Sequence, residues 1–173
     1  MPRVLADGKI KFTILTEPPA DPKAPTAAEL NGGIDLSCKV LSSDFNWTAT
    51  DSDRIAEKAL CDEGNANAIG ASNYSVGFTL WRYYLAEGGI DPTEDAGFAA
   101  VKEKGTTLYG YARRTDKPAT EAWEDGDEIY LGGEFTTDTP QIPGDAGGWL
   151  KWRVNGEMQR GYPFIAVDGS GSA

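Results

Sequence analysis

Acidic side chains gather between residues 121 and 128 of this chain of 173 residues. The carboxylates in that stretch are Glu121, Glu124, Asp125, Asp127 and Glu128. Closely spaced carboxylates can bind a hard cation such as Ca²⁺, or can supply the acid and base of a hydrolase. The stretch lacks the glycine-anchored spacing of an EF-hand loop, and a second acidic stretch at 62–67 lacks the downstream glutamate. We therefore predict that these acids are solvated loop residues, with a calcium site or a small carboxylate-based hydrolase as the alternatives.

Histidine is absent from the chain. Imidazole is the side chain that titrates nearest neutral pH and the commonest metal ligand, so Ser-His-Asp triads, Cys-His pairs and His-containing zinc sites are all excluded. Cys38 and Cys61 form no CxxC pair, and two thiols cannot complete a zinc site. We expect both thiols to be buried and reduced, with a disulfide as the alternative. The chain is therefore predicted to have no cofactor, no metal and no catalytic activity.

The chain is strongly acidic, with 16 basic and 27 acidic residues and a formal net charge of −11. Such a surface repels nucleic acid and anionic lipid. The N-terminus is charged and lacks the apolar stretch of a secretory signal. The most apolar window, 74–85, contains Arg82 and is too short to span a bilayer. We expect a protein that is made and folded in a cytoplasm and that has no membrane partner.

Aromatic residues are the second group that could bind a ligand, because an exposed aromatic ring can stack on a sugar. The chain has five tryptophans: Trp47, Trp81, Trp123, Trp149 and Trp152. Trp149 and Trp152 fall on opposite faces of one expected strand, so they cannot form a shared platform. Aromatic and arginine side chains are also enriched in protein–protein contacts. We predict core or subunit-contact roles, with a carbohydrate-binding β-sandwich module as the alternative; the contact candidates are Trp81, Tyr83, Arg113, Arg114, Trp123, Asp51 and Asp53.

Most of the elements that position these residues are expected to be strands. Period-two or apolar patterns predict strands at 9–15, 34–40, 74–85, 106–114, 128–137 and 149–158. One clear helix begins at Asp91-Pro92-Thr93-Glu94, which supplies an N-cap aspartate and an N1 proline, and it ends at Gly105. Thr26 and Glu29 predict a capping box on a short helical turn, and 54–61 could form another short helix. The expected fold is mainly β with one flanking helix (α+β), in a single domain at 1–167 followed by a flexible tail at 168–173.

The strand expected at 128–137 has two unlike faces. Ile129, Leu131 and Phe135 point to one side, and the other side carries Glu128, Tyr130, Glu134, Thr136 and Asp138. The apolar side belongs to a core. The acidic side must face water, a cation, or something that the protein repels.

Three blocks of the sequence resemble one protein family. GTTLYGYARRT at 105–115, GDEIYLGGEFTTDTP at 126–140 and PTAAELNGGIDLSC at 25–38 are similar to major tail proteins of long-tailed, non-contractile bacteriophages, particularly those of actinobacterial hosts. The likeness keeps the same order from Val4 to about Pro143. The resemblance implies that the subunit is a β-sandwich or partly closed barrel of the tail-tube type. It also implies that six copies form a ring and that the rings stack into a tube through which the DNA leaves the particle.

This resemblance gives the acidic strand face a purpose, because a tube that conducts DNA should not bind it. Glu128, Glu134 and Asp138 are therefore predicted to face the lumen, and the loop at 42–72 is predicted to contact a neighbouring ring. The implied partners are further copies of the chain, a tape-measure protein, and tail-terminator or tail-tip proteins. The implied location is the virion tail, assembled in the host bacterial cytoplasm.

Overall fold

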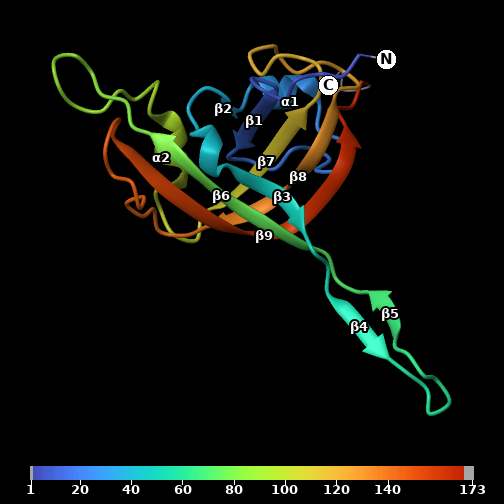
Figure 1. The fold of residues 1–173 in the computed structure, drawn as a ribbon. Helices are drawn as coiled ribbons and strands as arrows, with labels where there is room; N and C mark the ends of the chain where they lie inside the picture. Colours follow the sequence, from blue (N-terminus) through green and yellow to red (C-terminus); the bar gives the residue numbers. More distant parts are fainter. Residues whose placement is uncertain (1, 170–173) are drawn as a thin grey trace.

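A computed structural model describes residues 2–169 and shows a mostly β protein (Figure 1). Within these residues, seven strands form one antiparallel sheet in the order β2-β1-β7-β8-β9-β6-β3. Their bounds are β1 Ile10–Leu15, β2 Ile34–Asp35, β3 Asn46–Thr50, β6 Asn73–Trp81, β7 Thr107–Arg114, β8 Glu128–Thr137 and β9 Lys151–Ala166. A separate two-stranded hairpin consists of β4 Arg54–Glu57 and β5 Ala66–Ile69. The predicted mainly β fold is confirmed.

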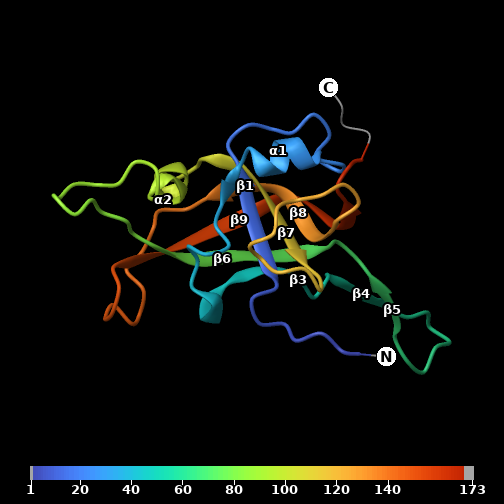
Figure 2. The ribbon, with the colours of Figure 1, turned by 90° about the horizontal axis from the view of Figure 1, so that it is seen from above.

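The large sheet curls strongly but does not close into a barrel in the described part of the chain (Figures 1 and 2). The segment at 36–41 runs between its two sides. At one end the Leu36 amide donates to the Phe12 carbonyl of β1 at 2.8 Å, and at the other the Leu41 amide donates to the Thr79 carbonyl of β6 at 2.9 Å. This short segment ties distant strands together, in agreement with the predicted sandwich-like fold.

The main hydrophobic core lies inside the curl and is organised around Trp47 of the edge strand β3. The Trp47 ring packs against Phe12 of β1 and Phe135 of β8, with centroid distances of 4.9 and 5.2 Å. Its indole nitrogen donates to the Leu131 carbonyl at 2.9 Å, so the polar edge of the buried ring is satisfied. One side chain thus links strands from both sides of the curved sheet.

A row of glycines makes room for these aromatic rings. Gly110, Gly133 and Gly161 are direct neighbours across β7, β8 and β9. A Cβ atom on Gly110 would lie 2.5 Å from the Trp47 ring, and one on Gly161 would lie 2.5 Å from the Tyr74 ring. The missing side chains let the rings approach the backbone.

Replacing Gly110 with alanine is expected to destabilise the subunit by about 1–3 kcal/mol, because the added methyl overlaps the Trp47 ring in a packed core. Urea denaturation measures the change. Gly144→Ala is the matched control, since a Cβ there meets no atom within 4 Å. Equal unfolding midpoints for the two variants would contradict the close approach of Trp47 to Gly110.

Two short α-helices and one 3-10 turn accompany the sheet in the region 2–169: α1 Ala27–Asn31, α2 Ala96–Val101 and η1 Ser42–Asp44. The capping box predicted for α1 is confirmed, with reciprocal hydrogen bonds between Thr26 and Glu29. Helix α2 begins later than predicted. The Asp91 carboxylate accepts the amides of Thr93 and Glu94, which holds a separate turn, and Asp95 is the residue that precedes the helix.

Other local predictions were wrong. Residues 54–57 form β4 instead of a helix, the predicted strand at 34–40 is reduced to β2, and β9 continues well past residue 158. Cys38 and Cys61 are both exposed free thiols and not buried ones. Of the tail predicted at 168–173, residues 170–173 lie outside the described residues, and the Asp168 amide donates to the Pro25 carbonyl at 2.9 Å.

Candidate functional site

Strand β8 changes the face on which it buries side chains between Ile129 and Leu131. Leu131 and Phe135 belong to the core inside the curl, whereas Ile129 packs with Tyr111 in a second cluster on the opposite face of the sheet. Opposite this point β9 carries Phe164, whose φ of 50° is left-handed, and the β8–β9 ladder has no pair at this residue although the register is the same on both sides of it. The register of the ladder shifts farther along, between Glu134 and Phe135. The regular alternation predicted along β8 is therefore wrong at its start.

The three predicted lumen residues consequently do not share one strand face. Glu128 is exposed at the beginning of β8, before the change. Glu134 is half-buried and lies opposite Tyr109 of β7 and Arg160 of β9. Asp138 is exposed just after β8, where its amide donates to a carbonyl of β9 at 2.9 Å. Glu134 and Asp138 lie beyond the change, toward the end of the strand.

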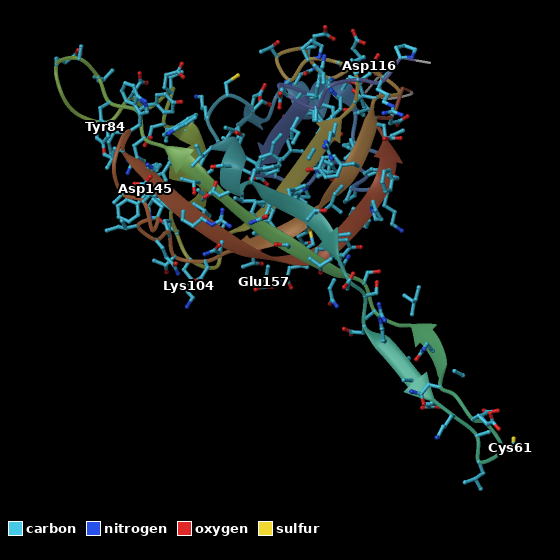
Figure 3. All side chains as sticks on the ribbon, in the orientation of Figure 1. Cys61, Tyr84, Lys104, Asp116, Asp145 and Glu157 are labelled. Carbon is cyan, nitrogen blue, oxygen red and sulfur yellow. The ribbon has the colours of Figure 1, made fainter. Side chains whose placement is uncertain are left out.

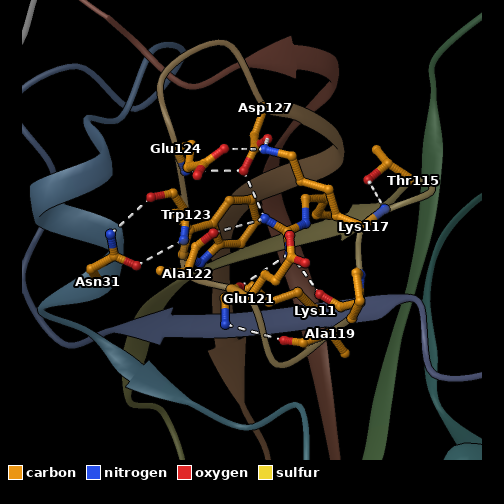
Figure 4. Close-up of polar contacts among 12 residues, drawn as sticks. Lys11, Asn31, Thr115, Lys117, Ala119, Glu121, Ala122, Trp123, Glu124 and Asp127 are labelled. Carbon is orange, nitrogen blue, oxygen red and sulfur yellow. Dashed lines mark hydrogen bonds and ion pairs between the residues drawn. The ribbon is translucent and has the colours of Figure 1, made fainter.

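Arg113 is fully buried. Its hydrogen-bond partners come from the excursion at 115–127, of which Figure 4 labels Glu121, Ala122 and Asp127. Its guanidinium donates to the Asp127 carboxylate at 2.7 Å. It also donates to three backbone carbonyls, those of Pro118, Glu121 and Ala122, at 2.9, 3.1 and 3.1 Å. A planar guanidinium suits this role because its donors spread in several fixed directions. Arg113 thus holds the excursion of its own subunit in place, and its side chain is not accessible to a neighbouring subunit.

Two acids of the 121–128 stretch are paired with a lysine. The Lys117 ammonium donates to Asp127 at 2.6 Å and to Glu124 at 2.5 Å. Burial raises the pKa of Asp127, but hydrogen bonds from Lys117, from the Glu124 amide and from Arg113 outweigh it and hold that pKa below its usual value. Asp127 is buried, so its predicted solvent exposure was wrong. Across residues 2–169 no group of three or more Cys, Asp or Glu side chains could hold a metal ion.

Trp123, another predicted contact residue, is also buried. Its indole nitrogen donates to the Thr13 hydroxyl of β1 at 2.9 Å, and its backbone exchanges two hydrogen bonds of 2.9 Å with the Asn31 side chain. Together with Trp47 in the core, this removes two of the five tryptophans from any sugar platform. Trp149 is the strongly exposed one, at 81%.

The remaining contact candidates lie at or near the surface. Trp81 and Tyr83 are half-buried at the end of β6, and Arg114 is exposed beside buried Arg113. Asp51 and Asp53 mark the base of the β4–β5 hairpin, where the Asn73 side chain donates to both, to the Asp51 carbonyl at 3.1 Å and to the Asp53 carboxylate at 2.9 Å. These residues do not form one cluster.

The β4–β5 hairpin projects away from the sheet, with Cys61 near its tip (Figure 3). Each residue of its two strands is exposed. Three large apolar side chains are exposed on it, Ile55 at 53%, Leu60 at 109% and Ile69 at 84%. A lone two-stranded hairpin is marginally stable in water, so contact of these side chains with another molecule would stabilise it. Sequence reasoning missed the hairpin, although Gly64 and Asn65, which directly precede β5, were a turn signal.

A second set of exposed apolar residues lies at the other end of β6. They come from the loops at 82–92 and 139–150 and comprise Tyr84, Leu85, Ile90, Ile142, Trp149 and Leu150. The Arg82 amide donates to the Leu150 carbonyl at 2.9 Å, which joins the two loops. In Figure 1 these loops and the hairpin leave the sheet on opposite sides. The subunit thus carries apolar surface at two separated ends.

A family model described as phage tail tube protein matches residues 1–167. The chain belongs to the phage tail tube protein family. The resemblance found in the sequence is therefore confirmed, and the protein is a structural subunit of a virion tail that self-assembles into a tube. No curated protein was found that matches the sequence.

For a tail tube subunit, apolar surface at two separated ends has a direct interpretation. Contacts between unlike surfaces of identical copies generate rings when the rotation closes and filaments when it does not, and a tube needs both kinds.

The helices within residues 2–169 do not combine the length and the apolar character that a membrane span needs.

Proposed function

We propose that this tail tube subunit forms hexameric rings that stack into a tube with a negatively charged lumen, through which DNA passes without being bound. The observation that carries the proposal is the projecting apolar hairpin of β4 and β5 in a chain whose family builds tubes. The hairpin reaches beyond the subunit body and so can contact a copy in the next ring. The subunit does this without catalysis or a cofactor.

Within the ring, the candidates for contacts between copies are the exposed or half-exposed residues of the predicted set: Trp81, Tyr83, Arg114, Asp51 and Asp53. The loops at 82–92 and 139–150 add apolar surface beside Trp81 and Tyr83. At its ends and along its axis the tube meets a tape-measure protein and tail-terminator or tail-tip proteins, and assembly takes place in the host cytoplasm. Electron microscopy of assembled tubes measures the ring symmetry, and any symmetry other than sixfold would overturn the hexamer.

The lumen charge is assigned to Glu128, Glu134 and Asp138. A net charge of −11 per copy, repeated around each ring, repels a duplex that carries one negative charge for about every 1.7 Å of its length. Without attraction to the wall, the DNA releases no counterions there and does not adhere. Glu134 and Asp138 are the better candidates for facing the lumen together, because both follow the point at which β8 changes the face that it buries.

Changing Glu128, Glu134 and Asp138 together to lysine is expected to leave tubes intact but to make them retain DNA. The prediction is a gain of duplex binding that weakens steeply with salt, and a fall in infectivity of roughly tenfold or more. A filter-binding assay over a salt series and plaque counts measure the two effects. The matched control reverses three exposed acids of the excursion, Asp116, Glu121 and Asp125, and changes the net charge equally. If both triple variants behave alike, the lumen assignment is wrong.

A further inference from the structure

The curled sheet has an open cavity of about 470 Å³ at the end where the N-terminal arm joins β1. Its wall is mainly apolar and includes Ile10, Phe12, Leu36, Val40 and Phe45. Residues 6–8 of the arm, Ser37, Ser42 and Ala119 complete the lining. The space is larger than one aliphatic side chain, and it opens to solvent.

We propose that this cavity receives the tip of the β4–β5 hairpin from a second copy of the chain, with Leu60 as the inserted side chain. The inference rests on the proposed tube assembly and specifies its contact between rings. Leu60 is 109% exposed at the end of a projecting hairpin, so its side chain contacts little of its own subunit. A side chain of this kind and an apolar cavity form the two halves of a heterologous contact.

The hairpin tip and the cavity lie at positions that allow copies of the subunit to stack. Figure 3 shows Cys61 at the hairpin tip, below the sheet, and Asp116 at the upper end of the sheet. Lys9, which follows the lining residue Gly8, donates to the Asp116 carbonyl at 2.6 Å, so the cavity belongs to the Asp116 end. A copy displaced along this direction brings its hairpin to the cavity of the next, and the same displacement can be repeated without end.

Charged side chains lie beside both the hairpin tip and the cavity, and some of them are of opposite sign. The hairpin tip carries Asp62 and Glu63, which are both exposed. Beside the cavity lie half-buried Lys9 and exposed Arg114, which is the partner of the lining residue Ile10 in the β1–β7 ladder. Asp7 of the lining and exposed Asp116, whose carbonyl accepts from Lys9, are acidic, so Lys9 and Arg114 are two cations in a rim of mixed charge. Opposite charges at the edge of an apolar contact favour one orientation of docking.

The cysteines of the chain report on this contact. Cys61 follows Leu60 at the tip, and Cys38 lies between the lining residues Ser37 and Val40. Both are exposed and free in the subunit. Docking of the tip into the cavity therefore brings Cys61 of one copy close to Cys38 of the next.

A short bismaleimide, which joins two thiols, tests the proximity in tubes of the full chain that have first been verified by electron microscopy. Wild-type tubes are expected to give a ladder of linked subunits on denaturing gels, with Cys38–Cys61 as the linked peptide pair by mass spectrometry. Cys38→Ser tubes and Cys61→Ser tubes are each expected to give no link. Mixed tubes of these two variants are expected to give dimers only, because each subunit then carries a single thiol and can be linked once.

A second pair of variants tests the docking itself. Leu60→Asp and Ala6→Trp, which narrows the cavity mouth from the exposed arm, are each expected to raise the protein concentration needed for tubes at least tenfold, whereas Leu60→Met is expected to leave it unchanged. Tubes without a Cys38–Cys61 link, or a link that survives in either serine variant, would overturn the contact alone. Failure of the wild-type chain to self-associate would overturn the proposed assembly together with it.

Discussion

Replacing residues 54–69 with a two-residue Asn-Gly turn is expected to abolish tube assembly while the subunit stays folded. The fold survives because each residue of β4 and β5 is exposed and the base of the hairpin closes by itself: the Gly70 amide donates to the Asp53 carbonyl at 2.6 Å. Assembly fails because three exposed apolar side chains are lost. Burying them in a neighbour is worth about 4 kcal/mol or more, which is roughly a thousandfold in each contact.

Light scattering and electron microscopy measure assembly of this variant, and circular dichroism with thermal unfolding measures its fold. Changing Ile55, Leu60 and Ile69 together to serine keeps the length of the hairpin and is expected to fail as well, whereas Asn67→Ser, on the same hairpin, is expected to assemble normally. Normal tubes from the shortened chain would show that the hairpin has no part in assembly.

Arg113→Ala is expected to destabilise the subunit by about 3–5 kcal/mol, the range for removing one partner of a buried ion pair. The substitution leaves Asp127 without its guanidinium partner and leaves the carbonyls of Pro118, Glu121 and Ala122 without their donor. Urea denaturation of the unassembled subunit measures the loss. Arg114→Ala is the matched control, because the neighbouring arginine is exposed, and its expected effect is within about 0.5 kcal/mol.

The same buried pair has a pH signature. Because the pKa of Asp127 is lower in the folded subunit than in the unfolded chain, its charged form stabilises the fold above the unfolded pKa, and this contribution is lost as the pH falls through the folded value. Arg113→Ala is expected to flatten the acid limb of the stability profile, and Arg114→Ala is expected to leave it unchanged. Similar losses and similar profiles for the two variants would contradict the buried role of Arg113.

Local signals predicted several elements closely. Strand β8 begins at Glu128 and ends at Thr137 as its alternation indicated, and the Thr26–Glu29 capping box forms as expected. Both features depend on residues only a few positions apart, so a single sequence contains the information.

Other predictions were wrong because contacts between residues far apart in the sequence determine the structure there. Residues 54–61 carry a short helical stripe, yet 54–57 pair with 66–69 and the hairpin stands free of the core. A short apolar pattern does not distinguish a helix from a strand, and the partner strand decides. Similarly, β8 changes faces opposite the left-handed backbone of Phe164, a residue of another strand that the alternation within β8 cannot reveal.

Four properties follow from the order and types of the residues alone: the β-rich fold, the acidity, the lack of imidazole chemistry and the likeness to tail tube proteins. Which charged side chains are accessible to a partner depends instead on the packing of the folded chain, as Arg113 and Arg114 show. Successive residues of a strand point to opposite faces, and on β7 the excursion at 115–127 covers the face that carries Arg113. Whether a strand face is covered depends on where other segments pack. For this reason one of two adjacent arginines, Arg113, is buried and binds the excursion, while the other, Arg114, is exposed to solvent.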